Sequence, residues 1–158
     1  MSSDQEQHEA AFFDLGDNTA LVCVDHQQYQ KAIVPQLIDM TYKVHLGLFE
    51  EDVVLKLKTY NYDVVIVYEN FKGSTLQTNP ILAELTRRPH EQRRQHFVVL
   101  LSHRLATNDA MSGFVNSVDQ VVNITDLANL KPILRRGISQ HHELYSVFNE
   151  MLKSVQAL

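Results

Sequence analysis

The sequence predicts an α/β domain with a doubly wound sheet of five parallel strands and a long C-terminal helix. The first observation behind this prediction is residues 63–69, a near-continuous apolar, β-branched run typical of a strand buried under helices on both faces. The second is that strand-like and helix-like segments alternate along the chain. Such alternation requires parallel pairing with right-handed crossovers. The residues just past the central strand then lie at the edge where open α/β sheets bind ligands.

The composition is that of a single domain. A chain of 158 residues is long enough to bury one core, and a net charge of −5 without a basic face argues against nucleic-acid binding. Cys23, the single cysteine, lies in an apolar run, so we expect a small buried hydrophobe and no disulfide. No run of about eighteen apolar residues is present. We therefore expect a cytoplasmic protein without membrane insertion, whose partners are proteins.

The first half of the chain contains three of the five expected strands. Residues 1–18 are mostly polar and end in a turn composition, so we expect a flexible leader. Residues 21–24 predict a short buried strand, and residues 43–48 alternate apolar and polar side chains like a half-exposed edge strand. Residues 63–69 are the third strand. A helical repeat follows each of the first two, with Tyr29, Ile33, Leu37 and Met40 in one helix and Val53, Val54, Leu57 and Tyr60 in the other.

The second half supplies the remaining strands at residues 97–101 and 121–122. The start signals of the last three helices are Pro80, then Thr107 or Asn108, and finally Asp126. The sum is five strands alternating with five helices, which indicates a flavodoxin-like sheet of order 2-1-3-4-5. We assign residues 19–136 to this domain and residues 137–158 to a helical extension.

Polar residues end four of the five strands, and together with the element order they resemble the receiver domain of bacterial response regulators. In that family the first strand ends in two acidic residues that hold magnesium, and the third in the aspartate that accepts the phosphoryl group. The fourth ends in a serine or threonine, and the fifth in a lysine followed by a proline. The matching positions in this chain are Asp25 and His26, Tyr68, Ser102, and Asn123.

This set lacks most of the groups that phosphoryl transfer needs, namely a carboxylate nucleophile, a metal site and a cation. Tyr68 has a phenol with an ordinary pKa near ~10, which cannot form an acyl phosphate. Glu69 would reach the acceptor position only if the strand slipped by one residue, which would turn the whole run over. Gln120 also stands where the family has a switch aromatic.

The resemblance therefore implies a degenerate receiver, or pseudo-receiver. Such a domain would be a non-catalytic signal-transduction module, related to two-component systems, that works by protein–protein interaction independently of phosphorylation. It would need no cofactor. We expect no enzyme activity, and the sequence has neither a nucleophile elbow nor a phosphate-cradling glycine series.

An alternative function is a small-molecule or metal-binding domain. Asp25, His26, Glu69 and His103 all follow strands, so their side chains are expected at the same sheet edge. No short ligand-spacing motif accompanies them, and we expect no metal. The adjacent His141 and His142 cannot chelate together, because neighbouring helical positions diverge by about 100°.

An arginine cluster precedes the fourth strand and consists of Arg87, Arg88, Arg93 and Arg94. Arginines bind phosphates and carboxylates through bidentate contacts, so this cluster is a candidate for docking an acidic partner protein. A solvated loop is the simpler interpretation.

The last helix is longer than the sheet requires. Residues 126–153 correspond to roughly 40 Å of helix, about twice what a five-stranded sheet needs. We expect the far half to form a homodimer, because an exposed apolar stripe is rare on monomers. A bend at Gly137 that folds the helix back is the alternative. The residues expected at the dimer contact are Leu144, Tyr145, Phe148, Met151 and Leu152.

Overall fold

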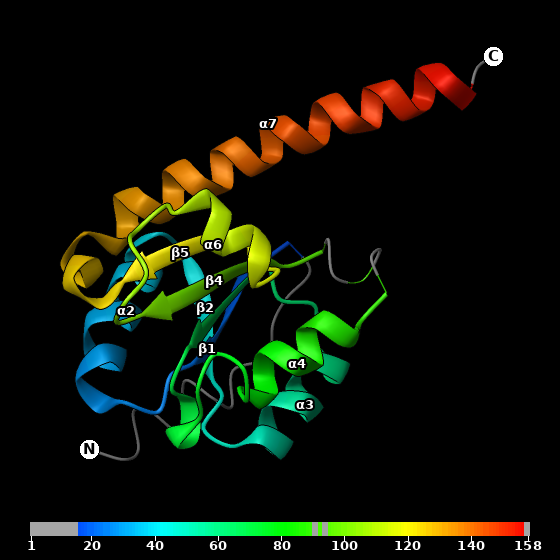
Figure 1. Ribbon diagram of the computed structural model, residues 1–158. Coiled ribbons are helices and arrows are strands. Elements are labelled where there is room, and N and C mark those ends of the chain that lie inside the picture. Colours follow the sequence, from blue (N-terminus) through cyan, green and yellow to red (C-terminus); the bar gives the residue numbers. More distant parts are fainter. Residues whose placement is uncertain (1–15, 90–91, 93–94, 157–158) are drawn as a thin grey trace.

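The sheet is built around the central strand that the sequence predicts. The computed structural model describes residues 16–89, 92 and 95–156, and its five strands are all parallel, in the order β2-β1-β3-β4-β5 (Figure 1). This confirms the predicted fold class and strand order. The strands are β1 (Asn18–Cys23), β2 (Tyr42–Leu46), β3 (Val64–Tyr68), β4 (Phe97–Ser102) and β5 (Gln120–Asn123).

Helices cover both faces of the sheet. The α-helices are α2 (Gln27–Asp39), α3 (Glu50–Thr59), α4 (Pro80–Arg87), α6 (Ala110–Val115) and α7 (Leu130–Gln156), and two 3₁₀ segments are η1 (Phe71–Gly73) and η2 (Ile124–Asn129). The pair α2 and α7 packs on one face and the pair α3 and α4 on the other, while α6 contacts β5. The sheet is therefore the middle of three layers.

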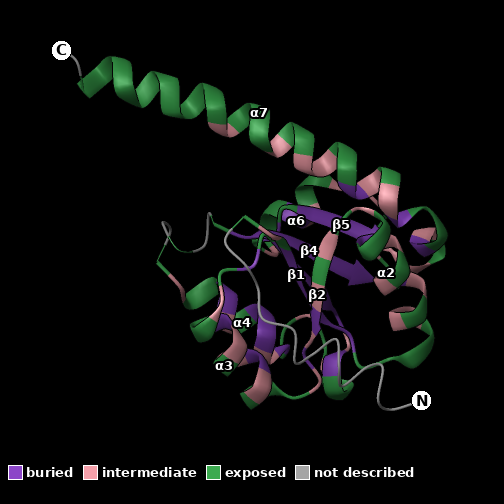
Figure 2. Ribbon diagram, turned by 180° about the vertical axis from the view of Figure 1, so that it is seen from behind, coloured by how far each residue is buried: buried purple, intermediate pink, exposed green. Residues whose placement is uncertain are grey.

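The side chains on the two faces of β3 pack into two separate hydrophobic cores. Val64, Ile66 and Tyr68 pack towards α2 and α7, whereas Val65 and Val67 pack towards α3 and α4. Every residue of β3 is buried, and Figure 2 shows the middle of the sheet in purple, the colour of buried residues. Burial on both faces explains why the strand reads as a continuous apolar run rather than an alternating one.

Two predicted helix starts are wrong. The carboxylate of Asp109, rather than Thr107 or Asn108, caps α6 by accepting a hydrogen bond from the Ser112 amide. Asp126 does not cap the last helix, because the chain first forms η2, capped by the side chain of Asn123. In both cases the side chain that caps is the one immediately before the first helical turn, where its oxygen reaches the orphan amides.

The helix α7 is continuous, so the bend considered at Gly137 does not occur. Gly137 instead lets the helix approach the sheet: a Cβ atom at this position would lie 2.6 Å from Oε1 of the buried Gln120. The first turns of α7 bury Leu130 and Leu134, and Ile138 packs against the same core. The rest of the helix projects beyond the domain (Figures 1 and 2).

Three further expectations from the sequence concern Cys23, membrane-spanning helices and residues 1–18. Cys23 is fully buried in β1, as predicted, and its burial raises the pKa of the thiol. Among the described residues no helix is both long and apolar enough to cross a membrane. The expected leader at residues 1–18 lies outside the described part of the chain except for its last three residues, of which Asn18 begins β1.

We predict that Gly137→Ala lowers the free energy of unfolding. Alanine is worth about 1 kcal/mol more than glycine in a helix, but here the added methyl group displaces Gln120, whose Nε2 donates to the Asn108 side chain at 2.8 Å and to the Ile133 carbonyl at 3.0 Å. Overpacking of this kind costs about 1–3 kcal/mol. Urea denaturation measures the change. In a Gln120→Ala background the same substitution should become neutral or stabilising; a stabilising effect in both backgrounds would contradict the close contact.

Candidate functional site

The residues predicted for the receiver crevice lie at the carboxyl ends of the strands. Asp25 and His26 follow β1, Tyr68 ends β3 with Glu69 directly after it, and Ser102 ends β4. Parallel pairing brings these strand ends to one edge of the sheet. The pairing of Tyr68 with Leu101 in the β3–β4 register leaves Tyr68, and not Glu69, as the last strand residue, so the strand has not slipped.

Glu69 is the centre of a buried hydrogen-bond network. Its side chain is 2% exposed, its Oε2 accepts from the Ser102 hydroxyl at 2.9 Å, and its Oε1 accepts from the His103 amide at 2.8 Å. The Ser102 oxygen in turn accepts from the amides of Arg104 and Leu105, at 3.2 and 3.1 Å. The hydroxyl therefore uses both its hydrogen and its acceptor capacity inside the protein.

Aromatic rings cover the neighbouring part of the edge. The Tyr68 hydroxyl is hydrogen-bonded to Nε2 of His103. The ring of Tyr29, in the first turn of α2, lies edge-on to both, with centroids 5.5 Å from Tyr68 and 6.1 Å from His103. His26 stacks on Tyr29 at 3.8 Å. Contacts between these rings thus run from the start of α2 across β3 to the end of β4.

The environment of Tyr68 makes its phenol a weak acid. Burial, followed by the nearby Tyr29 ring and the charges of Glu69 and Asp25, raises the pKa of Tyr68 above its ordinary value. The phenol is consequently neutral at physiological pH. It donates or accepts hydrogen bonds there, but it is no nucleophile for phosphoryl transfer.

The two residues at the metal-binding positions have local structural roles. The carboxylate of Asp25 is exposed and accepts a hydrogen bond at 3.0 Å from the amide of Lys72, a residue with left-handed backbone (φ 53°). Nδ1 of His26 accepts at 3.4 Å from the Tyr29 amide and so caps α2. In the described part of the chain, no three His, Cys, Asp or Glu side chains lie close enough together to hold a metal ion.

The positions of the family's lysine and switch aromatic hold amide side chains. Nδ2 of Asn123 donates to the carbonyls of His103 and Leu105, at 3.2 and 2.9 Å, which ties the loop after β4 to the start of η2. Gln120 is 6% exposed and is fixed by its bonds to Asn108 and Ile133. The side chain at the switch position is therefore held in place.

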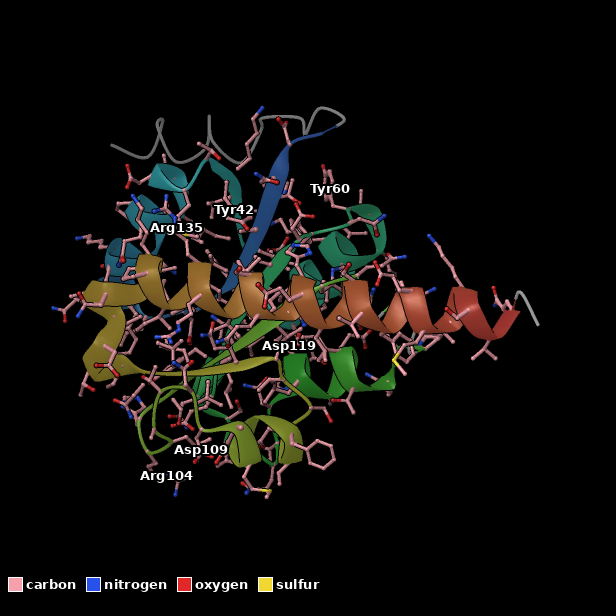
Figure 3. All side chains as sticks on the ribbon, turned by 90° about the horizontal axis from the view of Figure 1, so that it is seen from above. Tyr42, Tyr60, Arg104, Asp109, Asp119 and Arg135 are labelled. Carbon is pink, nitrogen blue, oxygen red and sulfur yellow. The ribbon has the colours of Figure 1, made fainter. Side chains whose placement is uncertain are left out.

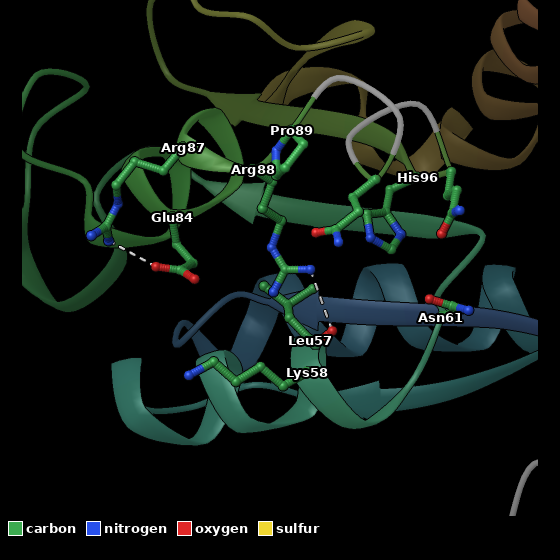
Figure 4. A pocket seen from close by; sticks show the side chains of 10 residues that line it. Leu57, Lys58, Asn61, Glu84, Arg87, Arg88, Pro89 and His96 are labelled. Atoms are coloured by element: carbon green, nitrogen blue, oxygen red, sulfur yellow. Dashed lines mark hydrogen bonds and ion pairs between the residues drawn. The ribbon is translucent and has the colours of Figure 1, made fainter.

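The arginine cluster lies apart from the crevice. Arg87 is 74% exposed and pairs with Glu84 at 2.7 Å, whereas Arg88 reaches the end of α3 and lines a cavity with Lys58 (Figure 4). Arg93 and Arg94 lie outside the described residues. This cavity is at the opposite edge of the sheet, beside the start of β4.

Sequence reasoning found the residues of the crevice but missed what two of them do. Glu69 was discounted because it lacked the strand position of a nucleophile, and Tyr29 was counted only as a core position of its helix. The signal for Glu69 was its place at the end of one predicted buried strand, at the same edge of the sheet as Ser102, which ends another. A carboxylate next to a hydroxyl at a buried edge requires a donor, and the serine supplies one.

Solved structures of other proteins share this fold. No family model matches the sequence, and no curated protein matches it. Among solved structures, a LuxR-family DNA-binding response regulator from Staphylococcus aureus is 19% identical, with a TM-score of 0.56 over 76% of this chain and 98% of that one. The receiver domain of the Francisella response regulator 1452 is 15% identical, with a TM-score of 0.60 over 80% and 98%.

The chemotaxis response regulator CheY4 of Vibrio cholerae is similar to the same degree, with 17% identity and a TM-score of 0.60 over 76% of this chain and 98% of that one. The TM-scores establish a shared fold, and at identities this low they establish nothing further. The chain therefore has the architecture of response-regulator receiver domains.

We predict that Glu69→Ala destabilises the protein much more than Asp25→Ala. Removing the buried carboxylate leaves the Ser102 hydroxyl and the His103 amide without their acceptor, which costs about 2–4 kcal/mol. Asp25 is exposed and accepts one hydrogen bond, so its loss should cost less than about 1 kcal/mol. Chemical denaturation measures the free energy of unfolding of both variants. Equal decreases would show that the hydrogen bonds of Glu69 stabilise the fold no more than that of Asp25.

Proposed function

We propose that this chain is a receiver-like signalling module that does not accept a phosphoryl group and works by binding other proteins. The observation that carries the proposal is the contact between Ser102 and the buried Glu69. In the family that the chain resembles, a hydroxyl at this position lies beside the phosphorylation site. Here the hydroxyl is bound to a carboxylate, and Tyr68 takes the place of the acceptor aspartate.

Electrostatics also disfavours a phosphoryl group at this edge. A phosphoryl group carries about −1.5 to −2 charges, and Glu69 places a carboxylate on the very hydroxyl that would have to approach it. Like charges a few ångströms apart repel strongly in a partly buried site. Asn123, in the position of the family's lysine, supplies no compensating positive charge.

The alternative function, a small ligand or metal in the crevice, receives less support. Both carboxylate oxygens of Glu69 accept hydrogen bonds within the protein. One atom of each other side chain is also bound, namely Nδ1 of His26, Oδ2 of Asp25 and Nε2 of His103. A ligand would have to break these bonds before it could form its own. An interaction module needs no such rearrangement, which is why we favour it.

We predict that the protein gains no phosphoryl group when it is incubated with acetyl phosphate and magnesium. The buried Glu69–Ser102 pair and the neutral phenol of Tyr68 leave no carboxylate at the acceptor position. Intact-mass spectrometry should show the unmodified mass of 18.2 kDa, while a phosphorylatable receiver domain treated in parallel gains about 80 Da through an acyl phosphate. A labile adduct on Asp25 or Glu69 would contradict the proposal.

We further propose that one protein partner is a second copy of this chain, bound through the projecting part of α7. The apolar residues there form two adjacent stripes. The inner flank of His141, Tyr145, Phe148 and Leu152 includes the half-buried ring of His141, which contacts the Phe97 ring at 5.3 Å. The outer flank of Leu144, Val147, Met151 and Val155 is 55–70% exposed.

The inner flank is directed towards the chain's own domain. Nδ1 of His141 lies 3.8 Å from Oδ1 of Asp119, and the His141 ring contacts Tyr145 at 4.6 Å. Figure 3 shows Asp119 alongside the middle of α7. Tyr145, expected from the sequence at the dimer contact, is half-buried, so the outer flank is the better candidate for contact with a second copy.

The outer flank suits pairing with itself. It carries no charged side chain, because Glu143, Glu150 and Lys153 lie on the remaining faces of the helix, so two identical copies meet no like charge. Its exposed apolar surface is roughly 500 Å² per copy, and a twofold contact would bury about 1,000 Å², the lower limit of a specific interface. At about 25 cal/mol per Å², this burial contributes roughly 25 kcal/mol, which exceeds an association cost of about 4–15 kcal/mol.

We predict that the intact protein is a dimer in solution, with a mass by light scattering of twice 18.2 kDa at micromolar concentration. The double substitution Leu144→Glu and Met151→Glu should give a monomer with an unchanged far-ultraviolet circular dichroism spectrum, since both side chains are exposed. The matched control, Ser146→Glu with Asn149→Glu on the polar face of α7, should remain dimeric. A monomeric intact protein, or a dimer that survives the outer-flank change, would refute the proposal.

A further inference from the structure

A cavity of about 570 Å³ opens at the edge of the sheet opposite to the receiver crevice. It lies between the carboxyl ends of α3 and α4 and the start of β4, and its lining includes Lys58, Arg88 and His96 (Figure 4). This volume is typical of small-molecule sites, which measure about 300–1,000 Å³. No part of the proposed phosphorylation-independent signalling accounts for it.

The charged side chains of the described lining residues carry an excess of positive charge. Glu84 is the one carboxylate among the described lining residues, and it pairs with Arg87 at 2.7 Å. Lys58 forms no hydrogen bond or ion pair with any residue that the structure describes, and Arg88 forms no ion pair with one. Two cations without a counterion among the described residues are unusual at one point of a chain whose net charge is −5. They attract an anion.

The guanidinium of Arg88 points to the kind of anion. Its Nη1 donates a long bond, 3.4 Å, to the Leu57 carbonyl at the end of α3, and its Nε is buried and has no acceptor in the part of the chain that the structure describes. A buried donor without a partner is costly. Phosphate and carboxylate groups present two oxygens in the spacing of the guanidinium fork, so either group can satisfy Nε together with a neighbouring nitrogen.

The helix ends limit how much negative charge the cavity holds. Both α3 and α4 end here, at Thr59 and Arg87, and each carboxyl end carries about half a negative charge. Part of the positive charge of Lys58 and Arg88 is therefore already offset. This balance favours a ligand with one oxyanion group over a polyphosphate.

Neutral polar groups complete the lining. The amide side chains of Asn61, Gln92 and Gln95 face the same cavity, and the ring of His96 is held in place because Nδ1 donates to the Tyr62 carbonyl at 2.6 Å. No Phe, Tyr or Trp lies among the described lining residues, so a nucleobase would find no stacking surface. Amides suit hydroxyl or carbonyl groups on the rest of a ligand.

We propose that this cavity binds a small polar molecule that carries a single phosphate or carboxylate group, held between Lys58 and Arg88. Such a ligand would bridge the ends of α3 and α4 and the start of β4. Its binding would let the domain respond to a small molecule at the edge opposite to the crevice. This proposal does not depend on whether the crevice accepts a phosphoryl group.

The test is a nuclear magnetic resonance titration of the ¹⁵N-labelled protein, with inorganic phosphate in one series and acetate in another, at ionic strength held constant with sodium chloride. We expect saturable shifts of the Arg88 Nε–H signal and of the backbone amides of Lys58 and Asn61 in at least one series. The series that saturates identifies the oxyanion. Arg88→Gln and Lys58→Gln should each weaken binding at least about tenfold, the loss expected for one charge-assisted contact.

The matched control is Arg104→Gln, an exposed arginine at the other edge of the sheet (labelled in Figure 3), which should leave the affinity unchanged. Lys58 is exposed and its substitution leaves the fold intact, so it tests the site even if Arg88→Gln disturbs the end of α3. The absence of saturable shifts with both anions, or equal affinity in the Lys58 and Arg104 variants, would overturn the proposal.

Discussion

The burial of β3 on both faces is the constraint on which the rest of the structure depends. A strand without a solvent face must be covered twice, which places α2 and α7 on one side and α3 and α4 on the other. The same burial decides what the end of the strand can do. Tyr68 belongs to the core under α2 and α7, while Glu69 is buried at the edge and must find its donors within the protein. Ser102 and the His103 amide supply them, so both oxygens of the carboxylate are already engaged within the protein.

The sequence predicted the sheet well because its signals are strong and local. The apolar run at residues 63–69 matches β3, in which every residue is buried. The alternation at residues 43–48 located the edge strand β2, but His45, on the side expected to be exposed, is the buried residue of that strand. The helix starts were harder. Thr107, Asn108 and Asp109 are all good capping residues, and only the backbone geometry, with Asn108 at φ 63°, selects Asp109.

The crevice could be located from the sequence but not understood from it. Side chains at strand ends are brought together by parallel pairing, which a pattern reveals. Their hydrogen bonds depend on directions that it does not. Gly137 is a similar case: as a residue in a long helix it suggested a bend, and only its proximity to Gln120 shows that its role is close packing. The cavity at Arg88 depends on residues from separate parts of the chain, at the end of α3, at the end of α4 and just before β4, so no local pattern indicated it.

The hydrogen bonds of Asn123 give α7 a mechanical property. They tie the loop after β4 to η2, and η2 leads directly into the 27 residues of α7. An unbroken helix of that length is a stiff arm of roughly 40 Å at 1.5 Å per residue. If its base tilts by about 5°, its tip moves by about 3.5 Å, enough to separate side chains that were in contact. Small rearrangements at the strand ends would thus be amplified where α7 meets whatever it binds.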